Sequence, residues 1–379
     1  MYIIDRYLLR QYVKTFLICW ISLTGLYVVV DAFSNLDEFL RYSEKSGRPL
    51  HDVLGEYYLF RSIYFYDRVS AILAMIAGMF TVTWIQRHQE LTALMAAGLS
   101  RVRVARPIFI AAGCLTLLGA CSRELVIPQI RRHLARDPKD LVGDSTADLR
   151  ARIDHDTGII FTGQFIQPSE QKIHRPKFVL SSGLDTYGKH LSAIDAFYQP
   201  ADANHPSGYW FKGVTSPIEL LSEGSLKIGD RPVVLTARDH AAWLSTSDVF
   251  VVSRIDFDQL GFDSKLRQFM STADLVRGLR NPSLDYGADV RVLIHSRMVQ
   301  PLRDLTLLFL GLPLVLRRET RNIYAAIGMC IVLTAVYLVV TMACEYLGGL
   351  LYIRPSLGAW LPLMIFVPIA AAMYDRIER

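Results

Sequence analysis

The chain has 379 residues, of which 51% are hydrophobic and 20% are charged, and its formal net charge is +5. The apolar content is too high for an ordinary soluble protein, whereas the charge content is too high for a chain embedded throughout in lipid. The basic residues lie beside apolar runs rather than in one block, which excludes a typical nucleic-acid-binding protein. The composition therefore predicts several membrane spans together with a sizeable water-facing domain.

Three apolar runs in the first third of the chain are long enough to cross a bilayer. They cover residues 16–33, 64–85 and 104–120. Residues 2–15 alternate apolar and basic positions and are predicted to form an amphipathic helix at the membrane surface. The first run has no small-residue cleavage site, so we expect it to remain as a span rather than act as a signal peptide. The polar connection at 34–56 is predicted to be partly helical.

The loop between the second and third spans, residues 87–100, has the pattern of a short exposed helix. Glu90 can complement the positive end of the helix dipole. Gly98 is a typical C-cap, and Ser100 can cap the helix that follows. The residues predicted to give this helix a surface of low relief are small: Ala93, Ala96 and Ala97. The pattern is typical of a helix that is bound closely by a partner protein. The alternative is a plain connecting loop on the membrane.

Between residues 131 and 282 no run is long and apolar enough to span a bilayer. Short runs of alternating apolar and polar residues, separated by turn residues, occur there instead. These runs cover residues 158–166, 177–180, 189–197, 208–214, 231–235 and 249–253. Short alternating strands at regular intervals predict an antiparallel β sandwich or jelly roll.

The last part of the chain returns to helical spacing at residues 273–279 and then contains three more apolar runs. These predicted spans cover residues 302–316, 324–346 and 359–373. Several ionisable residues lie near span borders, where we expect solvation at the interface: Arg303, Asp304 and Glu345. Asp67 and Arg68 near the start of the second span are adjacent and do not face each other on a helix, so each needs another partner or water.

The distribution of basic residues predicts the orientation of the spans. Loops on the cytoplasmic side carry an excess of lysine and arginine. An internal N-terminus places these basic residues in the cytoplasm: Arg6, Arg10, Lys14, Arg87, Arg101, Arg103, Arg106, Arg317, Arg318 and Arg321. The connection at 34–56 and the strand domain then lie outside, and both termini are cytoplasmic.

The sequence contains no signature of catalysis or of metal binding. All five cysteines lie in or beside apolar runs, without metal-ligand spacing or a disulfide framework. Neither a His-Glu-x-x-His motif nor a Gly-x-Ser-x-Gly elbow is present. The chain also lacks the glycine-rich loop that binds nucleotide phosphates. We therefore expect a protein that is not an enzyme and that binds no metal or cofactor directly.

Several stretches carry a family resemblance when they are taken with the order of three spans, a β-rich domain and three spans. They are DRYLL at 5–9, VDAFSNLDEFL at 30–40, ELTALMAAGLS at 90–100, Glu124 with Pro128-Gln129, and TADL at 272–275. In this combination the chain resembles the lipopolysaccharide-transport permeases (the YjgP/YjgQ family). The resemblance implies an α+β membrane protein of the inner membrane. Residues 1–130 and 283–379 would form the two membrane halves, and residues 131–282 a periplasmic antiparallel β jelly roll.

The resemblance also implies partners and a mode of action. Two permeases, which would be two paralogues or two copies of this chain, assemble with a dimer of a cytoplasmic ABC ATPase that hydrolyses ATP. They extract lipopolysaccharide and pass it to a periplasmic jelly-roll bridge protein. The residues implied to couple the ATPase are Glu90, Leu91, Ala93, Leu94, Ala97, Gly98 and Ser100. Among them, Glu90 is expected to pair with an arginine of the ATPase.

Candidates for the lipid path are less specific than those for coupling. They are Asp31, Arg61, Arg68, Phe161, Phe165, Phe178, Trp210 and Phe250. The family often carries lysines in the outer half of the first span, available to the phosphates of lipid A, but this chain has no lysine between Lys14 and Lys45. An ATP-driven transporter of another lipid or of a lipoprotein, and a non-transporting envelope assembly protein, therefore stay as alternatives.

Overall fold

The computed structural model describes residues 3–135, 149, 151–167, 170–202, 205–261, 267–284, 286–317 and 323–378. The chain divides into two compact units. A helical unit combines Met1–Leu134 with Gly287–Arg379, and a sheet unit comprises Ala135–Tyr286. Of the basic residues assigned above to the cytoplasm, Arg318 and Arg321 lie outside the described residues.

The helical unit is built from long helices, because its apolar runs are free of the polar turn residues that end helices elsewhere in the chain. Its first half consists of α1 (Ile3–Ser34), α2 (Leu36–Ser46), α3 (Leu50–Arg87), α4 (Glu90–Ala96), α5 (Arg101–Cys121), a π-helical turn (Ser122–Val126), α6 (Ile127–Gln129) and α7 (Arg131–Ala135). Its second half consists of α12 (Ala288–Arg317), α13 (Ile323–Gly349) and α14 (Pro355–Glu378).

Within the described residues, six helical stretches are long and apolar enough to cross a membrane. They are Ile3–Ser34, Leu50–Arg87, Arg101–Gln129, Ala288–Val315, Gly328–Gly349 and Pro355–Asp375. Three precede the sheet unit in the chain and three follow it. The predicted arrangement of three spans, an inserted β region and three spans is therefore confirmed.

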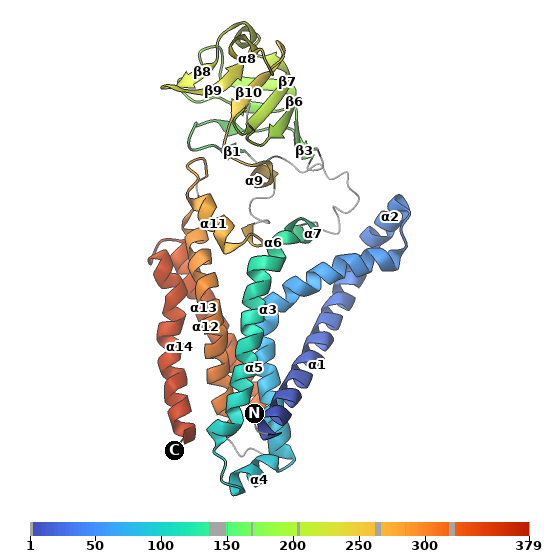
Figure 1. Ribbon diagram of the computed structural model, residues 1–379, viewed down its shortest axis with the longest axis vertical. Coiled ribbons are helices and arrows are strands. Elements are labelled where there is room, and N and C mark those ends of the chain that lie inside the picture. Colours follow the sequence, from blue (N-terminus) through green and yellow to red (C-terminus); the bar gives the residue numbers. More distant parts are fainter. Residues whose placement is uncertain are drawn as a thin grey trace. The chain divides into compact units, whose positions relative to one another are not determined.

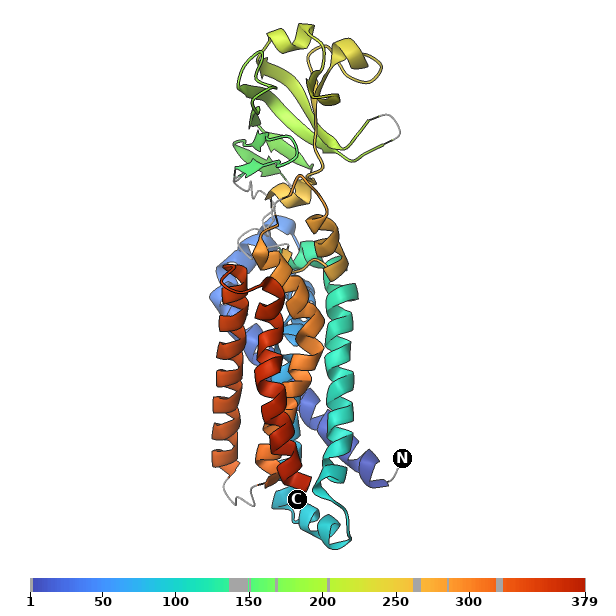
Figure 2. The ribbon, with the colours of Figure 1, turned by 90° about the vertical axis from the view of Figure 1, so that its left-hand side faces the viewer.

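Helix α12 lies in the middle of the helical unit and packs against α3, α5, α13 and α14 (Figures 1 and 2). Glycines allow these helices to approach closely. A Cβ atom on Gly311 of α12 would lie 2.9 Å from the side chain of Met75 on α3, and one on Gly78 would lie 3.3 Å from Leu312. Because helix association in lipid depends on close packing, these small residues join the two halves of the unit.

Several helices are longer than the predicted spans. Residues 2–15 and the first span are predicted as separate segments, but α1 is one continuous helix from Ile3. Helix α3 begins at Leu50 and α12 at Ala288, well before the apolar runs that predicted them. These extensions contain polar residues such as Ser296 that are buried inside the bundle. A hydropathy pattern underestimates such a helix because it treats every polar residue as facing water.

Within its described residues, the sheet unit contains ten strands that form one antiparallel sheet. The strands are β1 (Arg152–Ile153), β2 (Ile160–Phe161), β3 (Phe165–Gln167), β4 (Lys172–His174), β5 (Lys177–Val179), β6 (His190–Gln199), β7 (Gly208–Ser216), β8 (Leu226–Ile228), β9 (Arg231–Thr236) and β10 (Val249–Val252). The described part of the unit also contains the short helices α8 (Ala237–His240), α9 (Phe257–Gly261) and α11 (Thr272–Leu279) and a 3₁₀ turn at Glu219–Ser222.

The main path of the sheet runs β1-β2-β5-β6-β7-β10-β9-β8, and β4 joins β3 to β6. Each of the six predicted strand regions contains a strand, and the antiparallel pairing is confirmed. The sequence missed β1, β4 and β8, which have only two or three residues each. Whether the sheet closes as a jelly roll stays a prediction.

A charged cluster fastens the short strand β4 to β6. Asp195 on β6 contacts His174 Nδ1 at 2.8 Å and Lys172 Nζ at 3.0 Å. Burial by itself raises the pKa of Asp195, but the hydrogen bonds from Lys172 and His174 outweigh burial and hold this pKa below its usual value. A depressed carboxyl pKa stabilises the fold above the pKa of the unfolded chain, and this stabilisation is lost as the pH falls through the folded-state pKa.

Candidate functional site

The helix α4 is held at its first turn by a tyrosine from α1. The Tyr7 hydroxyl donates to the Glu90 carboxylate, with oxygen–oxygen distances of 3.0 and 3.2 Å. The preceding residue, Gln89, has a φ of +59°, a left-handed conformation that separates α4 from α3. Glu90 therefore already has a partner within the chain, in addition to any arginine of an ATPase.

Two leucines dock α4 onto the ends of three long helices. Leu91 is 7% exposed and belongs to a cluster with Leu8 of α1, Ile85 of α3 and Val104 of α5. Leu94 packs against the same cluster. These two predicted coupling residues therefore fix the helix in place, and do not line its exposed face.

The outer face of α4 is exposed and made mostly of small side chains. Its exposed residues are Thr92, Ala93, Met95, Ala96, Ala97 and Gly98. Gly98 has a φ of +84°, and the amides of Gly98 and Leu99 donate to the carbonyls of Met95 and Leu94. This is the double hydrogen bond of a Schellman C-cap, which favours glycine at the left-handed position. The predicted C-cap is confirmed.

The predicted cap of the next helix is also present. Ser100 Oγ accepts a hydrogen bond from the amide of Arg103 at the start of α5, at 3.3 Å. The segment from Gln89 to Ser100 is thus closed at its C-terminal end by local hydrogen bonds, and its first turn is held by Tyr7. It presents a defined surface rather than an irregular loop.

A buried ion pair inside the membrane bundle is the principal polar feature that the sequence did not assign. Arg123, in the π-helical turn after α5, donates from Nε to both carboxylate oxygens of Asp67 on α3, at 2.9 and 3.1 Å. Both side chains are less than a tenth exposed. Arg123 also donates to Gln300 of α12. The only sequence signal for this pair was the presence of ionisable residues in or beside apolar runs. Such residues inside a membrane usually face a partner or a cavity.

A second polar group joins α12 to α13. Arg303 donates to Glu345 and, at 2.9 Å, to Ser296 Oγ, while Ser296 donates to Glu345 at 2.5 Å. The expectation of interfacial solvation is wrong for Arg303, which is 9% exposed. Its backbone carbonyl also accepts from the Tyr337 hydroxyl at 2.9 Å. These residues pair across helices because an unpaired charge in the bundle would be costly.

The charged lipid-path candidates near the α1–α3 contact lie among tyrosines. Asp31 Oδ2 accepts from the Tyr58 hydroxyl at 2.8 Å, and the guanidinium of Arg61 lies 4.8 Å from the ring centre of Tyr57. Because the rings of Tyr57 and Tyr58 contact each other, Asp31 and Arg61 belong to one aromatic cluster. Arg68 instead donates to a tyrosine one turn earlier on α3, at 2.8 Å.

The aromatic candidates of the sheet unit divide into two groups. Three are fully buried in its core: Phe161, Phe178 and Phe250. Phe165 is half-buried and stacks on His174, and Trp210 donates from Nε1 to Asp248 at 3.1 Å. The three buried rings fill the core in this conformation. Their contribution to a lipid path stays a prediction.

Six spans, a capped helix docked on the ends of three of them, and an antiparallel sheet inserted after the third define a multi-pass membrane protein with the build of a transport permease. The family model of the lipopolysaccharide export system permease LptF/LptG matches residues 6–175 and 232–376. The chain belongs to this family. It is thus a transmembrane transporter subunit of an ATP-driven export system, not an enzyme. A comparison with curated proteins finds no match.

Proposed function

We propose that α4 is the docking helix for a cytoplasmic ABC ATPase, and that the chain uses ATP hydrolysis by that ATPase to extract lipopolysaccharide from the inner membrane. The observation that carries this proposal is the two-sided character of α4. Its inner side is fixed to α1, α3 and α5 through Leu91, while its outer side offers Ala93 and Ala97 to a close partner. A helix anchored in this way transmits a displacement to three spans together.

The energetics of the cargo support an external energy source. Moving acyl chains out of hydrocarbon costs about 0.8 kcal/mol for each CH₂ group exposed to water. A lipid with several acyl chains therefore needs both a sheltered route and an input of work. The chain lacks a phosphate-binding loop of its own. We infer that a second permease, or a second copy of this chain, pairs with this one to enclose a cavity for the lipid, and that a periplasmic bridge protein receives the lipid.

The proposed orientation places α4 in the cytoplasm and the sheet unit in the periplasm. The two ends of the chain and α4 lie at the same end of the helical unit (Figures 1 and 2). Arginines flank α4 at positions 87, 101 and 103, as the positive-inside bias favours. Three spans separate the N-terminus from the sheet unit, and an odd number of crossings puts the two on opposite sides.

Bulky substitutions on the outer face of α4 test the docking proposal. We expect Ala93→Trp and Ala97→Trp to reduce recovery of the ATPase in affinity purification from the native membrane at least tenfold, because an indole there prevents close approach. Membrane insertion should not change. The matched control is Ala242→Trp, since Ala242 is an exposed alanine of the sheet unit.

Recovery of the ATPase at the level of the unsubstituted chain with both α4 variants would contradict the docking proposal. Glu90→Arg is less informative alone, since it also breaks the contact with Tyr7. The same purification identifies the lipid that accompanies the complex. A lipid other than lipopolysaccharide would favour the alternative cargo. The absence of lysine between Lys14 and Lys45 is the sequence feature that keeps this alternative open.

A further inference from the structure

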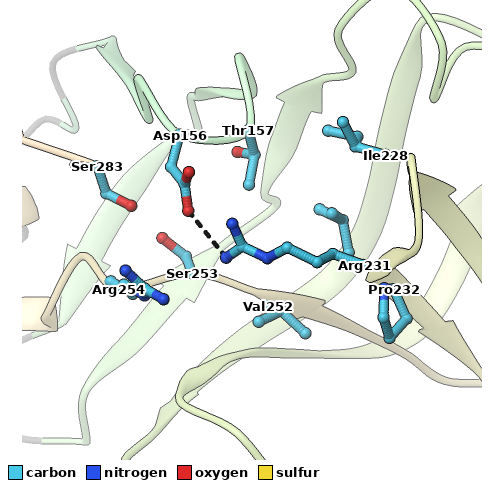
Figure 3. Close-up of a pocket in the computed structure, with 10 residues that line it drawn as sticks. Asp156, Thr157, Ile228, Arg231, Pro232, Val252, Ser253, Arg254 and Ser283 are labelled. Carbon is cyan, nitrogen blue, oxygen red and sulfur yellow. Dashed lines mark hydrogen bonds and ion pairs between the residues drawn. The ribbon is translucent and has the colours of Figure 1, made fainter.

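The sheet unit contains a small cavity where two turns meet the strands β8, β9 and β10 (Figure 3). Its volume is about 60 Å³. The lining residues come from the turn before β2, from the region of β8 and β9, from the end of β10 and from the turn after α11: Asp156, Thr157, Ile228, Arg231, Pro232, Val233, Val252, Ser253, Arg254 and Ser283. All of them belong to the sheet unit.

One buried hydroxyl in this cavity has no partner. Ser283 is 1% exposed, and its Oγ makes no hydrogen bond within the described part of the chain. The neighbouring Ser253 is also buried, but its Oγ donates to Asp154 at 2.6 Å and accepts from the amide of Ile255. Buried polar groups are rarely left unsatisfied, because the lost hydrogen bond to water is not replaced. The Ser283 hydroxyl thus needs a ligand or a water.

Two arginines line the same cavity. Arg231 donates to the Asp156 carboxylate at 3.1 Å, and this pair is drawn as the dashed line in Figure 3. The side chain of Arg231 is 66% exposed, so the pair is open to water and weakly held. Arg254 is exposed, and its guanidinium forms no ion pair with any described residue. Its backbone is fixed, because its carbonyl accepts from Asn281 Nδ2 at 2.8 Å.

The size and the donors of the cavity define the chemistry that it accepts. A water needs roughly 10–15 Å³ of this kind of volume, so the cavity has room for a group of several atoms but not for a whole sugar. Guanidinium groups bind phosphate oxygens in a forked geometry, and a hydroxyl adds one further donor. The two arginines outnumber the one lining carboxylate, that of Asp156, so the cavity disfavours a metal cation. An oxyanion is therefore the matching ligand.

We propose that this cavity is a binding site for the phosphate group of a phosphate monoester. Arg231 and Arg254 donate to its charged oxygens, and the Ser283 hydroxyl donates a further hydrogen bond. Asp156 competes with the phosphate for Arg231 and sets the affinity. The site is independent of the proposed role of α4, because all of its residues lie in the sheet unit.

Binding of inorganic phosphate to the purified full-length protein, measured by calorimetry in detergent micelles free of phospholipid, tests the site. We expect Arg254→Gln and Arg231→Gln each to weaken binding at least tenfold, and Ser283→Ala to weaken it about threefold to tenfold. Asp156→Asn should strengthen binding, because it removes the competing carboxylate. The matched control is Arg238→Gln: Arg238 is 63% exposed and pairs with Glu223 at 3.5 Å, outside the cavity.

A second measurement distinguishes a phosphate on the cargo from free phosphate. A photo-crosslinking amino acid replaces Ile228, which is 39% exposed at the cavity, in living cells. A lipopolysaccharide adduct that Arg254→Gln removes would assign the site to the phosphate groups of the transported lipid. Phosphate binding in the calorimeter without an adduct would assign it to a soluble phosphate.

The proposal is overturned if inorganic phosphate does not bind, or if Arg231→Gln and Arg254→Gln behave like Arg238→Gln. It is also overturned if Asp156→Asn fails to strengthen binding. This last variant separates a specific effect from misfolding, because a misfolded protein would not bind phosphate more tightly. If the α4 variants still recover the ATPase, the docking proposal fails, but the phosphate-binding results are not affected.

Discussion

The pair of Asp67 and Arg123 shows how a single residue can connect distant parts of a membrane bundle. Asp67 lies on the second span, Arg123 on the third and Gln300 on the fourth. The π-helical turn at Ser122–Val126 rotates Arg123 relative to a regular α-helix. Because both charges are buried, each depends on the other. Loss of one partner leaves an uncompensated charge in a region of low dielectric constant.

We therefore predict that Asp67→Ala destabilises the helical unit by about 3–5 kcal/mol. For a unit of this size the midpoint of thermal unfolding in detergent should fall by roughly 6–20 °C. The double variant Asp67→Ala with Arg123→Met should recover much of the loss, since the orphaned charge is gone. The control is Arg68→Gln, because Arg68 is exposed next to Asp67. Equal effects of Asp67→Ala and Arg68→Gln would refute the importance of the pair.

At the scale of one element, α4 is too short to be helical by itself. It has seven residues, whereas isolated helices shorter than about 12–15 residues are marginal in water. Its stability comes from the Schellman cap at Gly98, the Tyr7 contact and above all the burial of Leu91. The sequence predicted the Gly98 cap because capping depends on residues within a few positions. It could not predict Tyr7, which is 83 residues away from Glu90.

Truncation of the buried anchor should loosen α4 more than truncation of an exposed side chain of similar size. Leu91→Ala is expected to cost about 2–5 kcal/mol at the docking cluster. Hydrogen exchange of the α4 amides should then be at least about thirtyfold faster, in membranes without the ATPase. Met95→Ala is the matched control, since Met95 is 39% exposed. Similar exchange rates in the two variants would show that Leu91 does not anchor the helix.

At the scale of the whole molecule, the sheet unit is an insertion between two groups of three spans. Because three spans precede the sheet unit, the side of the membrane on which the N-terminus lies determines the side on which the sheet unit lies. The basic residues around α4 favour a cytoplasmic N-terminus and a periplasmic sheet unit. Membership of the LptF/LptG family agrees with a multi-pass membrane protein, and the orientation itself stays a proposal.

Labelling of single cysteines from outside the cell tests the orientation. In a chain without its native cysteines, we expect Ser46→Cys and Ser222→Cys to react with a membrane-impermeant maleimide in spheroplasts. Ala96→Cys should react only after lysis. All three positions are exposed, so access to the reagent depends on the side of the membrane. Labelling of Ala96→Cys in intact spheroplasts would reverse the proposed orientation.

The sequence by itself determined the number and order of the spans, the inserted antiparallel sheet, the C-cap of α4 and the N-cap of α5. Each of these depends on properties that neighbouring residues share: a long apolar run, a period of two, or a glycine and a serine at helix ends. The short strands β1, β4 and β8 escaped because two or three residues carry no measurable period.

Only the tertiary structure decided which polar residues meet. The sequence predicts interfacial solvation for Arg303, but Arg303 is buried and pairs with Glu345 of the neighbouring helix. Asp67 pairs with Arg123, 56 positions further along the chain. The cavity around Ser283 likewise collects residues from four separate segments of the sheet unit. Hydropathy reports the average preference of a segment for water. The partner of a buried charge or hydroxyl depends instead on which helices and turns pack together, and that packing is a property of the folded chain.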